Sequence, residues 1–477
     1  MKKIALFVIV CVLTACSTNR KQSSGELIAA ETEAGNFTRA AQIIDSLLLH
    51  QEMSNERIEA LRYAKDSLHR VMLDFNRSRE EIISWIEQQH QFTPSAEQLN
   101  RWELSKALEY RLIDGEKRYF SNAAANIFRL DTAAGKLSVS PPTKVESGTK
   151  KILDSHLTQL IPTGTKGRYL LPKVPVQVRY TLTVEPGVTK EGETIRAWLP
   201  YPRQDTERQT DVRFLGASQQ KYIFSEDKTG HTSIYMEQRS RRGEATVFSV
   251  AYAFSSQGEW FDLTQLDIQP YQTSTEDYRK YTSERIPHIR FSETIKTLAD
   301  SITNEADSPV EILQSIYRYI AANYPWASAL EYSTIADIPA YVIENGKGDC
   351  GQVTLLLITM LRYKGIPARW QSGWMTHPGE VNLHDWAEVY FEGVGWIPVD
   401  VSFGRGETLE NEKGREFFMS GIDSYRLYIN ADYSDIFFPE KLYPRSETVD
   451  FQRGEVETDN WNIYFNQWDY KMEITYQ

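Results

Sequence analysis

The stretch GKGDCGQVTLLLITML (residues 346–361) decides the fold of the C-terminal half of this chain. Gly346 and Gly348 permit a tight turn, and the apolar run after Cys350 predicts a buried helix. Cys350 is therefore expected at the N-terminus of that helix, where free backbone N–H groups and the helix dipole favour an anion. Such a position lowers the pKa of a thiol and enriches the reactive thiolate. We interpret Cys350 as a candidate nucleophile.

The first residues of the chain predict export. Residues 1–15 have a basic start, an apolar run too short to span a bilayer and small residues at the end, which is typical of a secretory signal peptide. The sequence LTAC (residues 13–16) resembles the lipobox of bacterial lipoproteins, which predicts a lipid on Cys16. We expect a protein lipid-anchored to the bacterial cell envelope, on the periplasmic or surface face of the outer membrane. A plain signal peptide is the alternative.

The cysteine count makes Cys350 unusual. The chain has three cysteines. Cys11 lies in the segment expected to be removed, and Cys16 would be lipidated. The mature chain is therefore predicted to contain one thiol and no disulfide, although exported proteins reside where thiols tend to oxidise. A buried, inert cysteine is the alternative interpretation.

Composition indicates a soluble, globular, multi-domain protein. The chain has 477 residues, of which 41% are hydrophobic and 25% charged, and a formal net charge of -12. This length exceeds one ordinary core. The sequence has no basic run or stripe of the kind that nucleic acid requires, so we expect no nucleic-acid partner.

Hydrophobic periodicity predicts an α+β protein. Helical spacing before residue 130 includes Leu104, Leu108 and Leu112, and residues 30–48 resemble half of a tetratricopeptide-type hairpin. A period of two, as in Val176–Val184, indicates antiparallel strands. The predicted parts are a signal peptide (1–15), a helical region (16–130), a linker (131–171), a β-sandwich (172–262), a core (263–448) and closing strands (449–477).

A thiolate nucleophile needs a base, and His is the side chain best matched to neutral pH. His384 opens the strand HDWAEV (residues 384–389), which can hold the imidazole rigidly. His377 is expected in a solvated loop tip. Asp400 ends the next strand, so antiparallel pairing would bring it near His384. Asp385 and Glu388 are weaker candidates, because one faces the other side of the strand and the other is displaced along it.

Several motifs in order resemble the transglutaminase-like superfamily. They are GDCG (348–351), LRYKGIPAR (361–369), HDWAEV (384–389) and GWIPVD (395–400). The resemblance implies a papain-like fold for the core, a catalytic triad of Cys350, His384 and Asp400, and neither a metal nor an organic cofactor. The region upstream would correspond to an accessory β-sandwich.

The implied reaction is acyl transfer through a thioester on Cys350. If water releases the acyl group, the enzyme is a cysteine peptidase or amidase acting on a peptide or protein, which we favour. A crosslinking transglutaminase is the first alternative, and a non-catalytic lipoprotein that binds an envelope partner is the second. Tyr324 or Trp326 is a candidate oxyanion donor. A group of tryptophans could line an acyl tunnel or belong to the core: Trp370, Trp374, Trp386 and Trp396.

Overall fold

We describe the protein from a computed structural model. The structure describes residues 23–50, 52–139, 147–226, 229–405 and 412–476. The predicted signal peptide and the lipidation site Cys16 lie outside these residues. The chain divides into two compact units, each considered by itself. The first unit contains residues up to 143 together with 285–290 and 325–349, and the second contains the remainder.

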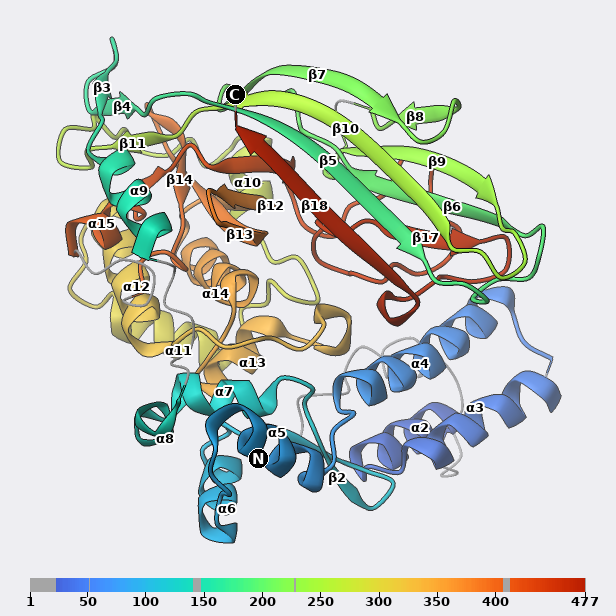
Figure 1. The fold of residues 1–477 in the computed structure, drawn as a ribbon. Helices are drawn as coiled ribbons and strands as arrows, with labels where there is room; N and C mark the ends of the chain where they lie inside the picture. The colour runs from blue at the N-terminus through green and yellow to red at the C-terminus, as the bar shows by residue number, and fades with distance from the viewer. Residues whose placement is uncertain (1–22, 51, 140–146, 227–228, 406–411, 477) are drawn as a thin grey trace. The chain divides into compact units, whose positions relative to one another are not determined.

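The N-terminal unit is mainly helical (Figure 1). Three of its helices begin with reciprocal capping boxes, at Ser23, Ser78 and Ser95. Residues 30–48 lie in the consecutive helices α2 and α3. The elements are α2 (Ser24–Glu33), α3 (Phe37–His50), α4 (Asn55–Asp74), α5 (Arg79–His90), α6 (Ala96–Leu104), β1 (Tyr110–Ile113), β2 (Glu116–Tyr119), α7 (Ala123–Leu130), α8 (Thr132–Leu137), η1 (Tyr332–Thr334) and α13 (Ile338–Asn345).

A β-hairpin interrupts the predicted helical run. The expected helix through Leu104, Leu108 and Leu112 is wrong, because α6 ends at Leu104 and β1 then pairs with β2. Asp114 and Gly115 form the turn with positive φ angles of 50° and 86°. An Asp-Gly pair between two strands is a strong hairpin signal, so this turn could have been predicted from the sequence.

The N-terminal helices also hold the segment that precedes Cys350 in the sequence. A carboxylate oxygen of Asp74 accepts hydrogen bonds from the Glu331 backbone N–H at 3.1 Å and from Thr334 Oγ1 at 2.8 Å. The buried Lys347 ammonium lies 2.9 Å from Glu109 Oε2. Residues 325–349 therefore fall in the same compact unit as the N-terminal helices, and the bounds of the 263–448 core stay a prediction.

The second unit contains the predicted β-sandwich. Its two four-stranded antiparallel sheets have the orders β18-β5-β10-β7 and β17-β6-β9-β8. Buried side chains from both sheets form one hydrophobic core. Both β17 and β18 come from the predicted closing segment. The strands are β5 (Val174–Val184), β6 (Thr194–Pro200), β7 (Gln209–Ala217), β8 (Tyr222–Phe224), β9 (Ser233–Arg239), β10 (Thr246–Ser256), β17 (Glu455–Thr458) and β18 (Trp468–Tyr476).

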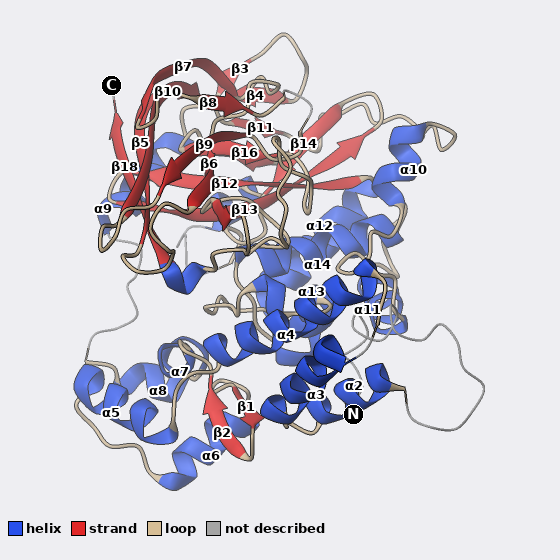
Figure 2. Cartoon of the chain, turned by 90° about the vertical axis from the view of Figure 1, so that its right-hand side faces the viewer, coloured by secondary structure: helices blue, strands red, loops and turns tan. Residues whose placement is uncertain are grey.

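A third antiparallel sheet carries the candidate site, in the order β14-β13-β12-β16. The predicted helix after Cys350 is present as α14, which is buried from Gly351 to Arg362 and packs against β12 and β13. Figure 2 shows the helices and strands of this part in a second view. The elements are α10 (Glu276–Thr282), α11 (Glu293–Ile302), α12 (Pro309–Asn323), α14 (Cys350–Tyr363), β12 (Ala368–His377), β13 (Glu380–Phe391), β14 (Gly395–Val399) and β16 (Arg426–Asn430).

The stretch expected to be a linker contributes to a fourth sheet, in the order β15-β11-β4-β3. Leu153 and Leu157 pack with Phe403 and Phe418 in a separate apolar cluster. The elements are α9 (Ser147–Leu157), β3 (Ile161–Pro162), β4 (Arg168–Leu170), β11 (Glu259–Phe261), α15 (Glu412–Phe417), β15 (Gly421–Ile422) and η2 (Phe465–Gln467). The α+β fold class is confirmed. None of the helices in the described ranges combines the length and apolarity needed to cross a bilayer.

Candidate active site

Cys350 is the first residue of α14 and is partly exposed. Its thiol Sγ donates a hydrogen bond to Asp385 Oδ2 at 3.4 Å. Asp385 belongs to β13 and immediately follows His384. The thiol therefore lies at a helix N-terminus, as the sequence predicts, and beside the segment of strand that carries the candidate base.

His384 and Asp400 form a buried pair. Antiparallel pairing of β13 with β14 places Asp400 one residue beyond the end of β14. His384 Nε2 lies 2.7 Å from Asp400 Oδ2, and the two residues are 4% and 0% exposed. The Phe403 backbone N–H donates to Asp400 Oδ1 at 3.2 Å. With Nε2 donating to the carboxylate, Nδ1 is the ring nitrogen that can exchange a proton with a reacting group.

Burial and two neighbouring charges set the pKa values of this pair. Burial lowers the pKa of His384 from its ordinary 6.5, and the charge of Arg426 lowers it further, whereas Asp400 acts in the opposite direction. Burial tends to raise the pKa of Asp400, but the charges of His384 and Arg426 outweigh this effect, so its pKa lies below 3.8. Asp400 is therefore ionised at neutral pH and can stabilise a protonated imidazole.

Asp385 is a site residue whose contact was missed by sequence reasoning. The Gln452 side-chain amide donates to Asp385 Oδ1 at 2.7 Å and to the His384 backbone carbonyl at 2.8 Å. One amide thus holds two consecutive residues of β13. No local pattern in the sequence reveals that the Cys350 thiol, at the start of α14, contacts the Asp385 side chain.

The prediction that His377 occupies a solvated loop tip is wrong. β12 continues through His377, which is 2% exposed. Its Nε2 lies 3.1 Å from Asp423 Oδ1. Asp423 is remote in sequence and precedes β16, so no local pattern around His377 signals this contact.

Glu388, one of the two weaker candidates for the histidine partner, forms ion pairs with two arginines. Its carboxylate pairs with Arg208 and, at 2.6 Å, with Arg369 Nε. Burial tends to raise its pKa, but the two guanidinium charges lower it from 4.5 to about 2. Arg208 also pairs with Glu259. Glu388 is therefore an ionised member of a buried ion cluster.

The candidate oxyanion donors occupy different units. Tyr324 caps the C-terminus of α12 in the second unit, and its carbonyl accepts a hydrogen bond from Arg405 Nη1 at 3.2 Å. Trp326 belongs to the N-terminal unit, where the Arg129 guanidinium lies 4.8 Å from the centre of its ring. The oxyanion donor stays a prediction.

The tryptophans near the site belong mainly to the core. Trp370, Trp374 and Trp386 are each 0% exposed. Trp396 is half-buried, with the Arg369 guanidinium 4.2 Å from the centre of its ring. This arrangement favours the core interpretation of these residues over an acyl tunnel.

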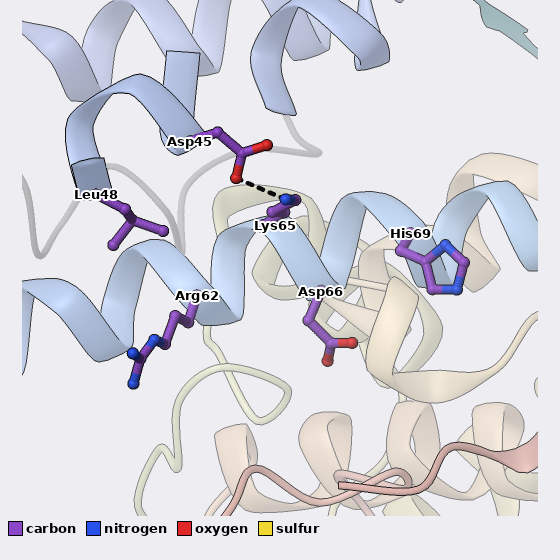
Figure 3. A pocket seen from close by; sticks show the side chains of 6 residues that line it. All are labelled: Asp45, Leu48, Arg62, Lys65, Asp66 and His69. Carbon is purple, nitrogen blue, oxygen red and sulfur yellow. Dashed lines mark hydrogen bonds and ion pairs between the residues drawn. The ribbon is translucent and has the colours of Figure 1, made fainter. Parts of the chain in front are cut away.

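A groove in the N-terminal unit is a separate feature (Figure 3). It has a volume of about 390 Å³ and lies along α3 and α4. Lys65 pairs with Asp45 at 2.6 Å, and Asp66 pairs with Arg70 at 2.7 Å. The charges along the groove are therefore largely neutralised within the unit.

Within the ranges that the structure describes, no cluster of three or more His, Cys, Asp or Glu residues is arranged to hold a metal ion.

Comparison with known families identifies the core. Residues 296–401 match the Transglutaminase-like superfamily. The chain is 26% identical over 131 residues to the uncharacterized protein YebA of Bacillus subtilis, and 23% identical over 253 residues to an uncharacterized protein of Haemophilus influenzae. These alignments cover 24% and 46% of this chain. They span 18% and 66% of the lengths of the two relatives.

Solved structures provide weaker likenesses. A Cytophaga hutchinsonii protein described as a candidate cysteine protease aligns over 65% of this chain and 92% of its own, with 13% identity and a TM-score of 0.44. The periplasmic domain of TgpA from Pseudomonas aeruginosa aligns over 65% of this chain and 87% of its own, with 15% identity and a TM-score of 0.27. By the family match of residues 296–401, the chain contains a transglutaminase-like domain within a larger α+β protein.

Proposed function

We propose that this protein is a thiol hydrolase, a cysteine peptidase or amidase, that cleaves peptide or glutamine-type amides through a thioester on Cys350. The observation that carries the proposal is the buried hydrogen bond of 2.7 Å between His384 and Asp400. This bond orients the His384 imidazole on β13. The next residue of that strand, Asp385, contacts the Cys350 thiol at 3.4 Å. A nucleophile, a base and a residue that orients the base are the parts required for nucleophilic acyl transfer.

In the acylation step, Cys350 Sγ attacks the amide carbonyl carbon while the thiol proton passes to His384 Nδ1. The resulting imidazolium is stabilised by the ionised Asp400. Backbone N–H groups at the start of α14 are suitable donors to the oxyanion. When the tetrahedral intermediate collapses, the C–N bond breaks and His384 gives its proton to the leaving amine, which leaves a thioester on Cys350.

In the deacylation step, His384 takes a proton from water, and the hydroxide oxygen forms a bond to the thioester carbonyl carbon. The C–S bond then breaks, the proton returns to the thiolate, and a carboxylic acid is released. A primary amine in place of water would yield a new amide. Water is favoured as acceptor because it is present at bulk concentration wherever the site is open to solvent, and Cys350 is partly exposed.

The proposal extends to the location of the protein. The sequence LTAC at residues 13–16 supports export and lipidation of Cys16, and a lipid on that residue would hold the domain at a membrane surface. Labelling of the full chain with radioactive palmitate in a bacterial host tests this anchor. Label in the wild type that is absent from Cys16→Ala is expected, and equal labelling of both would contradict lipidation at this residue.

The enzymatic proposal is tested with the mature chain and a glutamine-rich protein such as casein, with and without a fluorescent primary amine. We expect new N-termini or free acid in the wild type. Cys350→Ala should abolish the activity, and Asp400→Asn should lower its rate by roughly 10²- to 10⁴-fold, since the histidine loses its orienting partner. Incorporation of the amine that depends on Cys350 would indicate a transferase instead.

Thiol alkylation across pH provides the matched control, because it needs no substrate. Iodoacetamide should react with Cys350 in the folded protein at pH values below the ordinary thiol pKa of about 8.5. His384→Ala should remove this reactivity. A thiol that reacts only after denaturation would refute the enzymatic proposal and favour the non-catalytic interpretation.

A further inference from the structure

A chain of buried ionisable groups extends from the His384–Asp400 pair. Arg426 Nη2 lies 3.2 Å from Asp400 Oδ2, the oxygen that also contacts His384. Asp423 Oδ2 accepts hydrogen bonds from Arg426 Nη2 at 2.6 Å and from Arg426 Nε at 2.9 Å. His377 Nε2 meets Asp423 Oδ1 at 3.1 Å. We call Asp400, Arg426, Asp423 and His377 the Arg426 cluster.

The guanidinium of Arg426 is held tightly. Arg426 and Asp423 are both 0% exposed. Asp423 Oδ1 accepts a further hydrogen bond of 2.8 Å from the Tyr425 backbone N–H. The ring of Phe403 has its centre 4.4 Å from the guanidinium carbon. A guanidinium fixed by two carboxylates and an aromatic ring has little freedom to turn, so the Asp400 oxygen that it contacts is fixed as well.

The cluster is also a balanced set of charges. Two carboxylates surround one guanidinium, so the cluster and the adjacent His384 together carry one net negative charge when His377 and His384 are neutral. Protonation of His384 makes the net charge zero. Because water is excluded, interactions among these charges are stronger than they would be at the surface. A change in the charge of the cluster should therefore shift the pKa of His384.

We propose that Arg426, fixed by Asp423, is a positioning residue that holds the Asp400 carboxylate against His384 and sets the proton affinity of that histidine. The inference rests on the proposed function, since it concerns the same site. The direction of the pKa shifts supports the inference. Burial lowers the pKa of His384, and the positive charge of Arg426 lowers it further. Burial tends to raise the pKa of Asp423, but the charge of Arg426 opposes this effect, and the pKa lies well below 3.8.

Other titratable groups face this region and remain unchanged in the variants below. His156 Nε2 accepts from the Ser424 backbone N–H at 3.2 Å, and the Tyr317 hydroxyl donates to the Arg415 carbonyl at 2.8 Å. The groups that surround His384 and the cluster are Cys350 on α14, Asp385 on β13, His156 on α9, Tyr317 on α12, Tyr425, and Tyr428 on β16.

The test is the pH profile of Cys350 alkylation by iodoacetamide in the full chain. The upper transition of this profile marks the loss of the imidazolium proton. Arg426→Met removes the positive charge, so the upper transition should rise by about one pH unit. Asp423→Asn removes one of the two negative charges beside Arg426, so the transition should fall by a similar amount. Arg426→Lys keeps the charge but loses the planar fork, so we expect an unchanged transition and a several-fold slower reaction.

Opposite shifts in two variants are a result that a merely structural role would not produce. Circular dichroism and thermal melting establish that each variant is folded. If Arg426→Met does not fold, Asp423→Asn, which is nearly isosteric, and Arg426→Lys still decide the question. An upper transition that stays at the wild-type pH in Asp423→Asn, or shifts in the same direction in both charge variants, overturns the inference.

The two proposals fail in different ways. His384→Ala should abolish the upper transition altogether. If His384→Ala instead retains the wild-type profile, His384 is not the base and the proposed function itself is wrong. If His384→Ala abolishes the transition while the charge variants leave it in place, the proposed function stands and only the role of Arg426 is refuted.

Discussion

Glu388 provides a quantitative test of which carboxylate serves His384. It lies on the same strand as His384, but its carboxylate is buried against Arg208 and Arg369 and also accepts a hydrogen bond from Gln371 Nε2 at 2.9 Å. The perturbation is Glu388→Gln, which preserves shape and removes the negative charge. If Glu388 has a structural role, this change should reduce stability and leave thiol chemistry intact.

The expected loss of unfolding free energy in Glu388→Gln follows from the pKa of Glu388. A pKa lowered from 4.5 to about 2 on folding corresponds to about 3 kcal/mol of stabilisation at neutral pH. Because the folded-state pKa is the lower one, the stabilisation is fully present above pH 4.5 and is lost as the pH falls toward 2. The free energies of unfolding of wild type and Glu388→Gln should therefore differ by about 3 kcal/mol at pH 7 and converge in acid.

The assay is urea unfolding at a series of pH values, combined with iodoacetamide alkylation of the folded protein. Glu191→Gln is the matched control, because Glu191 is exposed and its replacement should change stability by no more than about 0.5 kcal/mol. Unchanged stability with loss of alkylation in Glu388→Gln would refute the reasoning, since it would make Glu388 rather than Asp400 the functional partner of His384.

Three further predictions each concern one other contact. Asp385→Asn removes a negative charge 3.4 Å from the thiol, so alkylation should become faster in mildly acidic solution; a slower reaction would show that Asp385 assists the thiol. Glu109→Gln leaves the buried Lys347 ammonium without its carboxylate, and thermal melting should show a loss of about 3–5 kcal/mol that a second change, Lys347→Met, partly restores. Gly373→Ala would place a Cβ 1.8 Å from a carbonyl oxygen of β16, so a variant that melts like the wild type would contradict the close approach of these strands.

Much of the fold was accessible from the sequence because it depends on local patterns. The apolar run after Cys350 predicted α14, and the alternation in Val176–Val184 predicted β5. The short turn after β13 predicted the antiparallel β13–β14 pair, which places Asp400 within 2.7 Å of His384. Periodicity and turn length act over a few residues, so one sequence is enough to recognise them.

Contacts between distant segments were not accessible in this way. Gln452, in the C-terminal segment, donates a hydrogen bond to Asp385 on β13. Asp423, in the segment before β16, contacts His377 at the end of β12. Residues 325–349 join the N-terminal helices through Asp74 and Glu109. No spacing rule links such residues, because they meet only after the chain has closed loops of tens to hundreds of residues.

The sequence by itself determined that Cys350 begins a buried helix and that a histidine and an aspartate follow it on consecutive antiparallel strands. Only the tertiary structure decided which groups surround them: Asp385 at the thiol, and Arg426 with Asp423 behind Asp400. The physical reason is the range of the interactions. Helix and strand periodicity arise from neighbouring residues, whereas the charges of a buried site are matched across segments that packing alone brings together.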